Sequence, residues 1–306
     1  MIGSVKQPKV SIIILNWNGL EDTIECLESL QKITYPNYEL IVIDNNSEGS
    51  DAEVLRGKFG GYIHLIENDK NYGFCEGNNI GMRHALKNQA DYILLLNNDT
   101  TVATDFLSEL VRVGESDSEI GLLGPKIYFY HEPNKIWFAG GRISLLAASS
   151  NRGYRQLDEG QFDQVSRVDF VSGSCMLIKR SVLECIGLLD ASYFFSFEDA
   201  DFSLRAIQAK FVNVYVPSAR IWHKVFSSGR RNPDITYYTS RNAMIFARKH
   251  FRAFRKASLR AVIGVITELV FYTVRNRDAR ILRTMVKGLR DGLTIDLKSS
   301  KAGRVT

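Results

Sequence analysis

The residues best suited to chemistry in this sequence stand at the end of an apolar run. Tyr92–Leu96 leads directly into Asn97, Asn98 and Asp99. Such a run is typical of a buried strand, and in open α/β sheets ligands bind in the crevice at the carboxyl ends of the strands. A carboxylate held there could bind Mg²⁺ or Mn²⁺, which prefer oxygen ligands and keep phosphate oxygens in their shell. The alternative is an ordinary turn in which Asx side chains bond the backbone.

A second acidic cluster lies about a hundred residues further on. Glu198, Asp199 and Asp201 follow the aromatic run Tyr193–Phe197. Carboxylates this close raise the pKa of at least one of them when the site is partly buried, so that one could accept a proton from a substrate hydroxyl. Phe197 and its aromatic neighbours would offer surfaces on which sugar rings stack. The alternative is a helix whose first-turn acids complement its dipole.

Other polar residues stand where further strands are expected to end. The residues that we expect to bind a donor here are Asn16 and Asn18 after one apolar run, Asp44 and Asn46 after the next, and Asn71, Gly73 and Asn78 in a Gly/Asn-rich turn. The turn is neither a Walker loop nor a dinucleotide fingerprint. Gly173 and Ser174 could present backbone groups to an acceptor, and Trp222 is expected to contact the acceptor as well. His223, which follows Trp222, is a candidate second metal ligand. Each of these residues could equally be a turn, bulge or core residue.

The elements that must position these residues alternate in type. Strands are expected at 10–15, 38–43, 63–67 and 92–96, separated by helices at 20–30, from near Ser50 with Ser47 as a candidate cap, and up to Lys87. This alternation predicts a mostly parallel, doubly wound α/β sheet. Later segments are expected to be extended at 121–130, 135–143, 169–179 and 212–216, with a loop over the site at 149–168 and helices at 180–186 and up to Ala209. We expect one large α/β domain over 1–235 and a helical region over 236–306.

The charge of the chain is divided unevenly. Residues 248–306 contain 15 Lys and Arg against 4 Asp and Glu, whereas the rest contains 24 against 30. The apolar stretch 257–274 holds Arg260 and Glu268, which favours an interfacial amphipathic helix over a membrane span, with packing on the body as the alternative. The four cysteines form no Cys-x-x-Cys pair, and no secretory signal is evident. We therefore expect a cytoplasmic protein at the inner face of the cell membrane.

Seven segments in order resemble glycosyltransferase family 2, in its rhamnosyltransferase-like branch. They are 10–16, 42–47, 71–79, 94–99, 173–178, 197–202 and 222–223, and the resemblance spans about Lys9 to Asn242. It implies that 1–235 form a GT-A catalytic domain with a Rossmann-like, mostly parallel mixed sheet, in which about 9–115 are the nucleotide half and about 116–235 the acceptor half; the basic helical region 236–306 follows it. It also implies an inverting transfer of a sugar, such as rhamnose, from a nucleoside diphosphate sugar to a hydroxyl of a glycan or lipid-linked acceptor in cell-envelope polysaccharide biosynthesis.

The resemblance also implies roles for single residues. Asp44 would contact the nucleobase, Asp199 would be the catalytic base with Glu198 beside it, and Asp99 and His223 would hold Mg²⁺ or Mn²⁺. The segment Asn97-Asn98-Asp99 stands where the family has Asp-x-Asp, so Asn97 replaces the first acid and would bond the ribose. Because Asn is a weaker ligand for a hard cation, this departure lowers the expected metal affinity.

Three other functions remain open from the sequence. A sugar-phosphate nucleotidyltransferase shares a similar nucleotide half, but its Gly-rich loop with Arg and Lys is absent from 16–20. A non-catalytic membrane adaptor could retain the fold. Nucleic-acid binding by the tail is disfavoured, because few aromatic residues are interleaved with its basic ones, and we expect no nucleic-acid partner.

Overall fold

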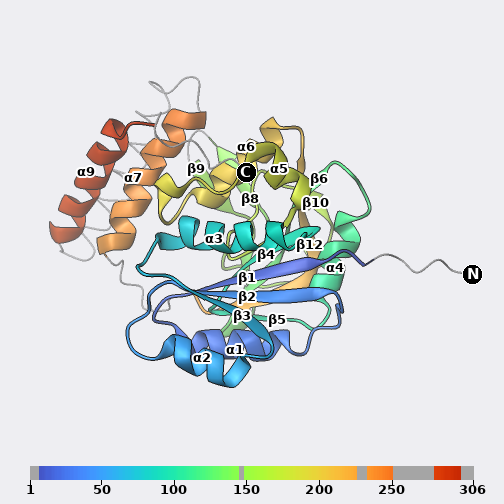
Figure 1. Ribbon diagram of the computed structural model, residues 1–306. Helices are drawn as coiled ribbons and strands as arrows, with labels where there is room; N and C mark the ends of the chain where they lie inside the picture. The colour runs from blue at the N-terminus through green and yellow to red at the C-terminus, as the bar shows by residue number, and fades with distance from the viewer. Residues whose placement is uncertain (1–6, 145–147, 226–232, 251–278, 298–306) are drawn as a thin grey trace, which may run out of the picture.

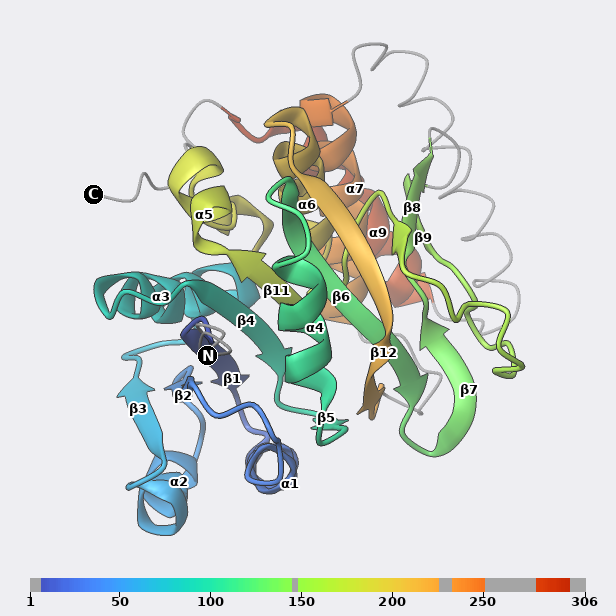
Figure 2. The same ribbon diagram turned by 90° about the vertical axis from the view of Figure 1, so that its right-hand side faces the viewer.

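A computed structural model describes residues 7–144, 148–225, 233–250 and 279–297 (Figures 1 and 2). Its centre is a mixed sheet of ten strands in which the order along the main path is β10-β12-β6-β11-β4-β1-β2-β3. The strands are β1 (Val10–Asn16), β2 (Tyr38–Asp44), β3 (Ile63–Glu67), β4 (Tyr92–Asn97), β5 (Thr100–Val102), β6 (Ile120–Phe129), β7 (Glu132–Phe138), β10 (Ser166–Arg167), β11 (Cys175–Lys179) and β12 (Val212–His223). A separate hairpin joins β8 (Gly141–Ser144) to β9 (Ala148–Asn151).

Helices cover both faces of the first strands. They are α1 (Leu20–Leu30), α2 (Asp51–Phe59), α3 (Gly73–Lys87), α4 (Phe106–Gly114), α5 (Arg180–Ile186), α6 (Glu198–Gln208), α7 (Pro233–His250) and α9 (Ala279–Thr294). Figure 1 shows α1 and α2 on one side of β1, β2 and β3, and α3 on the other. In α1 the residues at helical spacing, Thr23, Cys26, Leu27 and Leu30, are the buried ones, so one stripe of this helix packs on the sheet.

The expected α/β architecture is confirmed, with one antiparallel strand in the middle of the sheet. β3, β2, β1 and β4 are parallel neighbours. β11 then runs antiparallel to both β4 and β6, and β12 pairs with β6 in parallel. β4 and β11 are buried apolar runs almost throughout, as strands covered on both faces must be.

Several expectations about local structure were wrong. The segment 149–168, expected to be a loop, contributes β9 and β10 to the structure. The strand expected at 169–179 begins only at Cys175, and the strand expected to end at Val216 continues to His223 because a register shift after Val216 lets β12 resume its pairing with β6. Ser47 does not cap α2, since its hydroxyl donates to Asp44 at 2.6 Å instead.

The helices α7 and α9 pack closely against each other beside the sheet domain. A Cβ at Gly288 would lie 2.6 Å from the backbone oxygen of Tyr237, and one at Gly292 would also collide with the α7 backbone, so these positions permit the close approach. The amphipathic stretch expected at 257–274 lies outside the described residues. None of the helices that the structure describes combines the length and apolar character needed to cross a bilayer.

Candidate functional site

The carboxyl ends of three parallel strands meet at one edge of the sheet. Asn16 at the end of β1 is the register partner of Asp44 at the end of β2. Leu15, one residue earlier, is the partner of Asn97 at the end of β4. This alignment brings the polar residues expected from the sequence to the crevice where open α/β sheets bind ligands.

Asp44 is held by a buried network at this edge. The amide nitrogen of Asn16 donates to Asp44 Oδ1 at 2.8 Å and also lies within bonding distance of Ser47 and Asp51. The amide oxygen of Asn16 accepts a hydrogen bond from Thr23. Asn16 is fully buried and every polar atom of its side chain is bonded, so it orients Asp44 from beneath.

Two exposed asparagines flank Asp44. Asn18 and Asn46 have φ angles of 53° and 63°, a left-handed conformation that asparagine tolerates better than most residues. The side-chain oxygen of Asn18 accepts from the amide of Glu48 at 2.7 Å, which ties the loop after β1 to the loop after β2. The two expected donor residues therefore shape the rim around Asp44.

The Gly/Asn-rich turn forms the start of α3. Asn71 accepts hydrogen bonds from the amide of Gly73 and from the side chain of Asn45. Gly73 has a φ of 76°, and a Cβ there would collide with the ring of Phe194, so this position requires glycine. Asn78 lies deeper in α3, where its amide donates to the carbonyl of Phe74 at 2.8 Å.

Asp99 and His223 converge from β4 and β12. Asp99 Oδ1 lies 3.0 Å from His223 Nε2. These atoms do not form a directed hydrogen bond, and in the described structure Asp99 Oδ1 is a buried oxygen without a hydrogen-bond partner. The ring of Trp137 packs edge-on against His223 at 4.9 Å. An oxygen and an imidazole nitrogen that are both available at one point fit the donor set of a divalent cation.

The two asparagines before Asp99 have different neighbours. The amide of Asn97 lies 3.4 Å from His223 Nε2, beside the candidate metal ligands. The amide of Asn98 donates to Thr23 at 2.9 Å and so connects the end of β4 to α1. Within the ranges that the structure describes, no three His, Cys, Asp or Glu side chains cluster as a complete metal site.

Glu198 and Asp199 begin α6 and are both influenced by burial. Burial, with the neighbouring Asp199 as the second cause, raises the pKa of Glu198 to about 8. Glu198 Oε2 is buried and has no hydrogen-bond partner among the described residues. Burial also raises the pKa of Asp199, against two backbone amides, those of Gly173 and Ala200, that donate to its carboxylate. A carboxylate with a raised pKa is a stronger base, as proton abstraction from a hydroxyl requires.

The turn before β11 connects the two acidic segments. The backbone amide of Asn97 donates to the carbonyl of Ser174 at 2.9 Å. The backbone amide of Gly173 donates to Asp199 Oδ2 at 3.1 Å. Two hydrogen bonds through adjacent residues thus join the segment that carries Asp99 to the segment that carries Asp199. The end of β4, two residues before Asp99, and the carboxylate of Asp199 therefore contact the same turn.

Not every residue of the acidic and aromatic motifs faces this edge. Asp201 is fully buried and is paired with Arg205 and Lys249, which with a hydrogen bond from His250 hold its pKa well below the ordinary value. Phe197 packs against Phe246 of α7 at 5.6 Å, and Trp222 stacks on Tyr128 at 6.0 Å. Sequence reasoning missed Trp137, because nothing in its extended segment distinguishes a ring that packs on His223 from an ordinary core residue.

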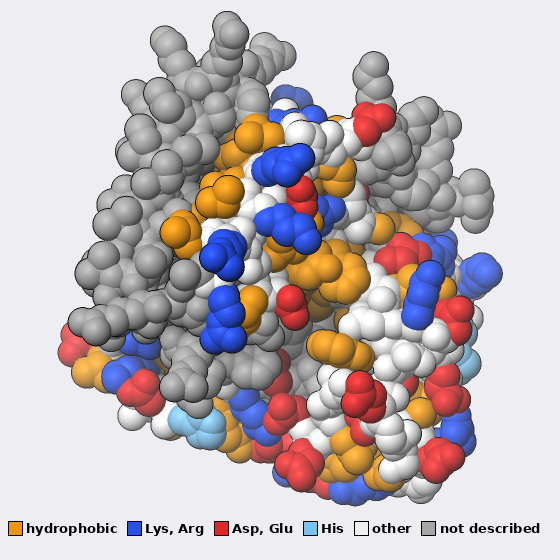
Figure 3. All heavy atoms as spheres, turned by 90° about the vertical axis from the view of Figure 1, so that its left-hand side faces the viewer, with side chains coloured by type: hydrophobic (Ala, Val, Ile, Leu, Met, Phe, Trp, Pro, Cys, Tyr) orange, Lys and Arg blue, Asp and Glu red, His pale blue; other side chains and the backbone are white. Residues whose placement is uncertain are grey.

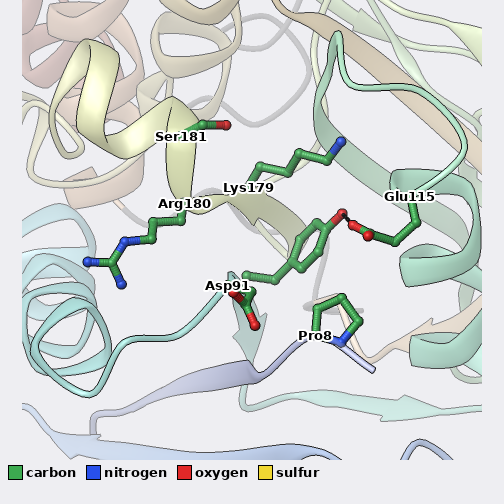
Figure 4. Close-up of a pocket in the computed structure, with 7 residues that line it drawn as sticks. Pro8, Asp91, Glu115, Lys179, Arg180 and Ser181 are labelled. Carbon is green, nitrogen blue, oxygen red and sulfur yellow. Dashed lines mark hydrogen bonds between the residues drawn. The ribbon is translucent and has the colours of Figure 1, made fainter. Parts of the chain in front are cut away.

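A cavity at the opposite edge of the sheet is a poor alternative site (Figure 4). It is lined by Pro8 and Asp91, which precede β1 and β4, and by Glu115, Lys179 and Arg180. It therefore lies at the amino ends of the parallel strands. Its polar groups already have partners: Lys179 donates to the carbonyl of Asp117, and Arg180 bonds Glu184.

Comparison with known proteins gives relatives that are themselves glycosyltransferases. The chain is 28% identical over 204 residues to the low-salt glycan biosynthesis hexosyltransferase Agl10 of Haloferax volcanii, covering 64% of this chain and 61% of Agl10. It is 22% identical to the dTDP-rhamnosyl transferase RfbF of Shigella flexneri, over 92% of this chain and 96% of RfbF. It is 25% identical to an N-acetylglucosaminyl-diphospho-decaprenol L-rhamnosyltransferase of Mycobacterium tuberculosis, over 86% of this chain and 92% of that protein. The chain spans only 24% of the length of another relative, the uncharacterized protein y4gI of Sinorhizobium fredii, at 29% identity over 71% of this chain.

Solved structures share the fold at lower identity. GalNAc-T7, crystallised with UDP, GalNAc and Mn²⁺, superposes with a TM-score of 0.65 at 18% identity, over 82% of this chain and 49% of that one. The mannosyltransferase PcManGT of Pyrobaculum calidifontis, in complex with GDP-Man and Mn²⁺, superposes with a TM-score of 0.60 at 13% identity, over 94% of this chain and 86% of that one. These likenesses confirm the GT-A fold expected from the sequence. The sequence profile described as "Glycosyltransferase like family 2" matches residues 8–257, and the chain therefore belongs to this family.

Proposed function

We propose that this chain transfers a sugar from a nucleoside diphosphate sugar to a hydroxyl group, with inversion at the anomeric carbon. The observation that supports this most directly is the pair of hydrogen bonds through Gly173 and Ser174 that join the Asp99 and Asp199 segments. An inverting displacement needs a group that binds the leaving diphosphate and a base on the other side of the sugar. Two acidic segments that contact one turn could supply these two groups.

On the donor side, Asp44 would accept from the nucleobase, and Asn71 and Gly73 would border the bound nucleotide. Asp99 and His223 would hold Mg²⁺ or Mn²⁺, since Asp99 Oδ1 is a buried oxygen with no other partner among the described residues. When bound, such an ion supplies Lewis-acid stabilisation of the charge that develops on the diphosphate. GalNAc-T7 and PcManGT were both crystallised with Mn²⁺, which agrees with this choice.

On the acceptor side, Asp199 would remove the proton from the attacking hydroxyl. The hydroxyl oxygen forms a bond to the anomeric carbon while the bond from that carbon to the diphosphate oxygen breaks. The proton passes to Asp199, and the nucleoside diphosphate leaves with the electron pair. Burial raises the pKa of Glu198 to about 8, which is above the ordinary range of a carboxyl. Glu198 would therefore stay largely protonated at neutral pH and leave Asp199 as the base.

A donor screen tests the proposal without knowledge of the acceptor. We expect dTDP-L-rhamnose with Mn²⁺ to raise the melting temperature more than dTDP-L-rhamnose alone, because a ligand at about 100 times its Kd stabilises by about 2.7 kcal/mol. The choice of dTDP-L-rhamnose follows the names of two relatives. UDP and GDP sugars complete the screen, and radiolabelled transfer to N-acetylglucosaminyl-diphospho-polyprenol measures turnover. If no nucleotide sugar shifted the melting temperature with or without metal, the proposal would be wrong.

The C-terminal helices offer a surface for a membrane that carries a lipid-linked acceptor. In α9, Leu282, Val286 and Leu293 share one stripe by helical spacing, and their exposed fractions are 38%, 55% and 46%. The exposed basic residues Arg283 and Lys287 lie beside the stripe. Figure 3 shows basic and hydrophobic side chains gathered on this face of the molecule. We propose that 1–235 form the catalytic domain and that the helical region 236–306 contacts an anionic membrane through the exposed stripe of α9, while α7 packs on the catalytic domain.

Vesicle binding tests this surface. The triple variant Leu282→Ser, Val286→Ser and Leu293→Ser is expected to sediment about tenfold less with phosphatidylglycerol vesicles than the unaltered chain, because it removes the apolar stripe and leaves the charge intact. The matched control replaces two exposed apolar residues on the catalytic domain, Leu157→Ser and Val165→Ser, and should not change sedimentation. Equal losses for both variants, or none for either, would remove α9 from the membrane contact.

A further inference from the structure

The segment that leads into the candidate base has an unfavourable backbone conformation. Phe194, Ser196 and Phe197 have φ angles of 61°, 74° and 72°, and none of them is glycine. Side chains with a Cβ rarely adopt this region, and such a conformation persists only where the surroundings enforce it. Because Glu198 and Asp199 follow directly, whatever enforces this backbone also sets the position of both carboxylates.

A single buried side chain of α7 makes three of the contacts that enforce it. The amide nitrogen of Asn242 lies 2.8 Å from the carbonyl of Tyr193, 2.7 Å from that of Phe195 and 2.8 Å from that of Ser196. The side chain of Asn242 is fully buried. Its amide oxygen accepts from the guanidinium of Arg241 at 3.2 Å, which fixes the orientation of the amide. Aspartate and leucine match its shape, but neither can donate these hydrogen bonds.

Neighbouring residues of α7 hold the same segment from the outside. Arg241 donates to the carbonyl of Ser192 at 2.7 Å. The ring of Tyr238 stacks on Phe194, with centroids 4.8 Å apart. The segment in turn contacts α3, because the carbonyl of Phe194 accepts from the amide of Phe74 at 2.7 Å. The Asn242 contact thus lies between α7, the first turn of α3 and the start of α6.

We infer that Asn242 is a positioning residue of the transferase, which fixes the carboxylate of Asp199 by holding the backbone of Phe194–Phe197. This inference rests on the proposed function, and it assigns to α7 a part in the reaction. Asn242 itself touches neither carboxylate. Its effect reaches Asp199 through the backbone, and the hydrogen bond from the Gly173 amide forms only while that backbone keeps the carboxylate at its present position.

Kinetics of Asn242→Ala test this inference. We expect kcat with dTDP-L-rhamnose to fall at least tenfold, while KM for this donor and the Kd of dTDP in Mn²⁺ stay within twofold. The acidic limb of the kcat profile should also move to lower pH. In the unaltered chain, burial raises the pKa of Glu198 and Asp199. A loosened segment would admit water to both carboxyls and so lower their pKa. Asn242→Asp should lose as much activity, since it keeps the shape and removes both donors.

A matched control separates positioning from a general loss of stability. Asn213 is also a buried asparagine whose amide donates to two backbone carbonyls, those of Asp169 and Ser203. Asn213→Ala should lower the melting temperature while leaving the pH profile in place. If Asn242→Ala does not fold, Tyr238→Leu removes the ring that stacks on Phe194 and also contacts Tyr237 and Arg241, and it makes the same test with a smaller expected loss. A drop in kcat no larger than that of Asn213→Ala, or one matched by a rise in KM, overturns the inference.

Hydrogen exchange keeps this test independent of the assay. In Asn242→Ala the backbone amides of 194–200 and of Gly173 should exchange at least tenfold faster, and those of β1 should not change. If the unaltered chain transferred no sugar from any donor, the proposed function would fail while the exchange result still decided whether Asn242 holds the segment. Unchanged exchange at 194–200 overturns the inference in either case.

Discussion

Asp199→Asn is expected to lower kcat by about 10²–10⁴-fold and to leave the Kd of dTDP-L-rhamnose unchanged. The substitution keeps the size of the side chain and an oxygen that can accept the hydrogen bond from the backbone amide of Gly173. It removes the carboxylate that accepts the proton. Asp44, Asp99 and His223, the residues proposed to bind the donor, are left unaltered by this substitution. The measurement is steady-state transfer together with calorimetric titration of the donor in Mn²⁺.

The pH dependence of the unaltered chain belongs to the same prediction. Because burial raises the pKa of Asp199 above the ordinary 3.8, turnover should fall as the pH is lowered through that raised pKa, with the deprotonated form active. Asp105→Asn, at an exposed acid that precedes α4, is the matched control and should keep full turnover. Undiminished turnover in Asp199→Asn would exclude this residue as the base.

Asp99→Ala is expected to act on donor binding, whereas Asp199→Asn is expected to act on kcat. We expect the affinity for dTDP-L-rhamnose in Mn²⁺ to fall at least about tenfold, or about 1.4 kcal/mol, to the value measured in a chelator. His223→Ala should have a similar effect, since Asp99 Oδ1 and His223 Nε2 lie 3.0 Å apart and would share one ion. Calorimetric titration of the donor with Mn²⁺ and with chelator gives both values.

The control for this pair is His64→Ala, at an exposed histidine of β3, a strand that β2 and β1 separate from β4. It should bind the donor as the unaltered chain does. A donor affinity that is independent of metal in the unaltered chain, or that remains metal-dependent in both Asp99→Ala and His223→Ala, would remove these residues from the metal site.

Features encoded by local pattern could be predicted from the sequence. The apolar runs of β1, β2 and β4 end in Asn or Asp, and parallel pairing in register then brings those ends together without further information. The bounds of α1 and of the end of α3 at Lys87 follow equally from helical spacing and flanking turns. The family resemblance added the order of the motifs, and the family assignment is confirmed by the profile over residues 8–257.

Features that depend on distant contacts could not be predicted. The left-handed residues Phe194 and Phe197 belong to residue types that favour strands, and the segment that contains them is held by contacts from α7, among them those of Asn242, nearly fifty positions later. Likewise, Asp201 looks equivalent to Asp199 in sequence. In the structure, however, Asp201 forms ion pairs with Arg205 and Lys249. A strand that pairs antiparallel between two parallel neighbours, such as β11, also has no signature in its own residues.

A crystal structure of Asp199→Asn with dTDP-L-rhamnose and Mn²⁺ tests the central claim most directly, because it traps the donor before transfer. The account predicts the metal on Asp99 and His223, the diphosphate bound to that metal, and the side chain at position 199 across the sugar from the diphosphate. A diphosphate bound away from Asp99, or a side chain at position 199 on the same side of the sugar as the leaving group, would contradict it.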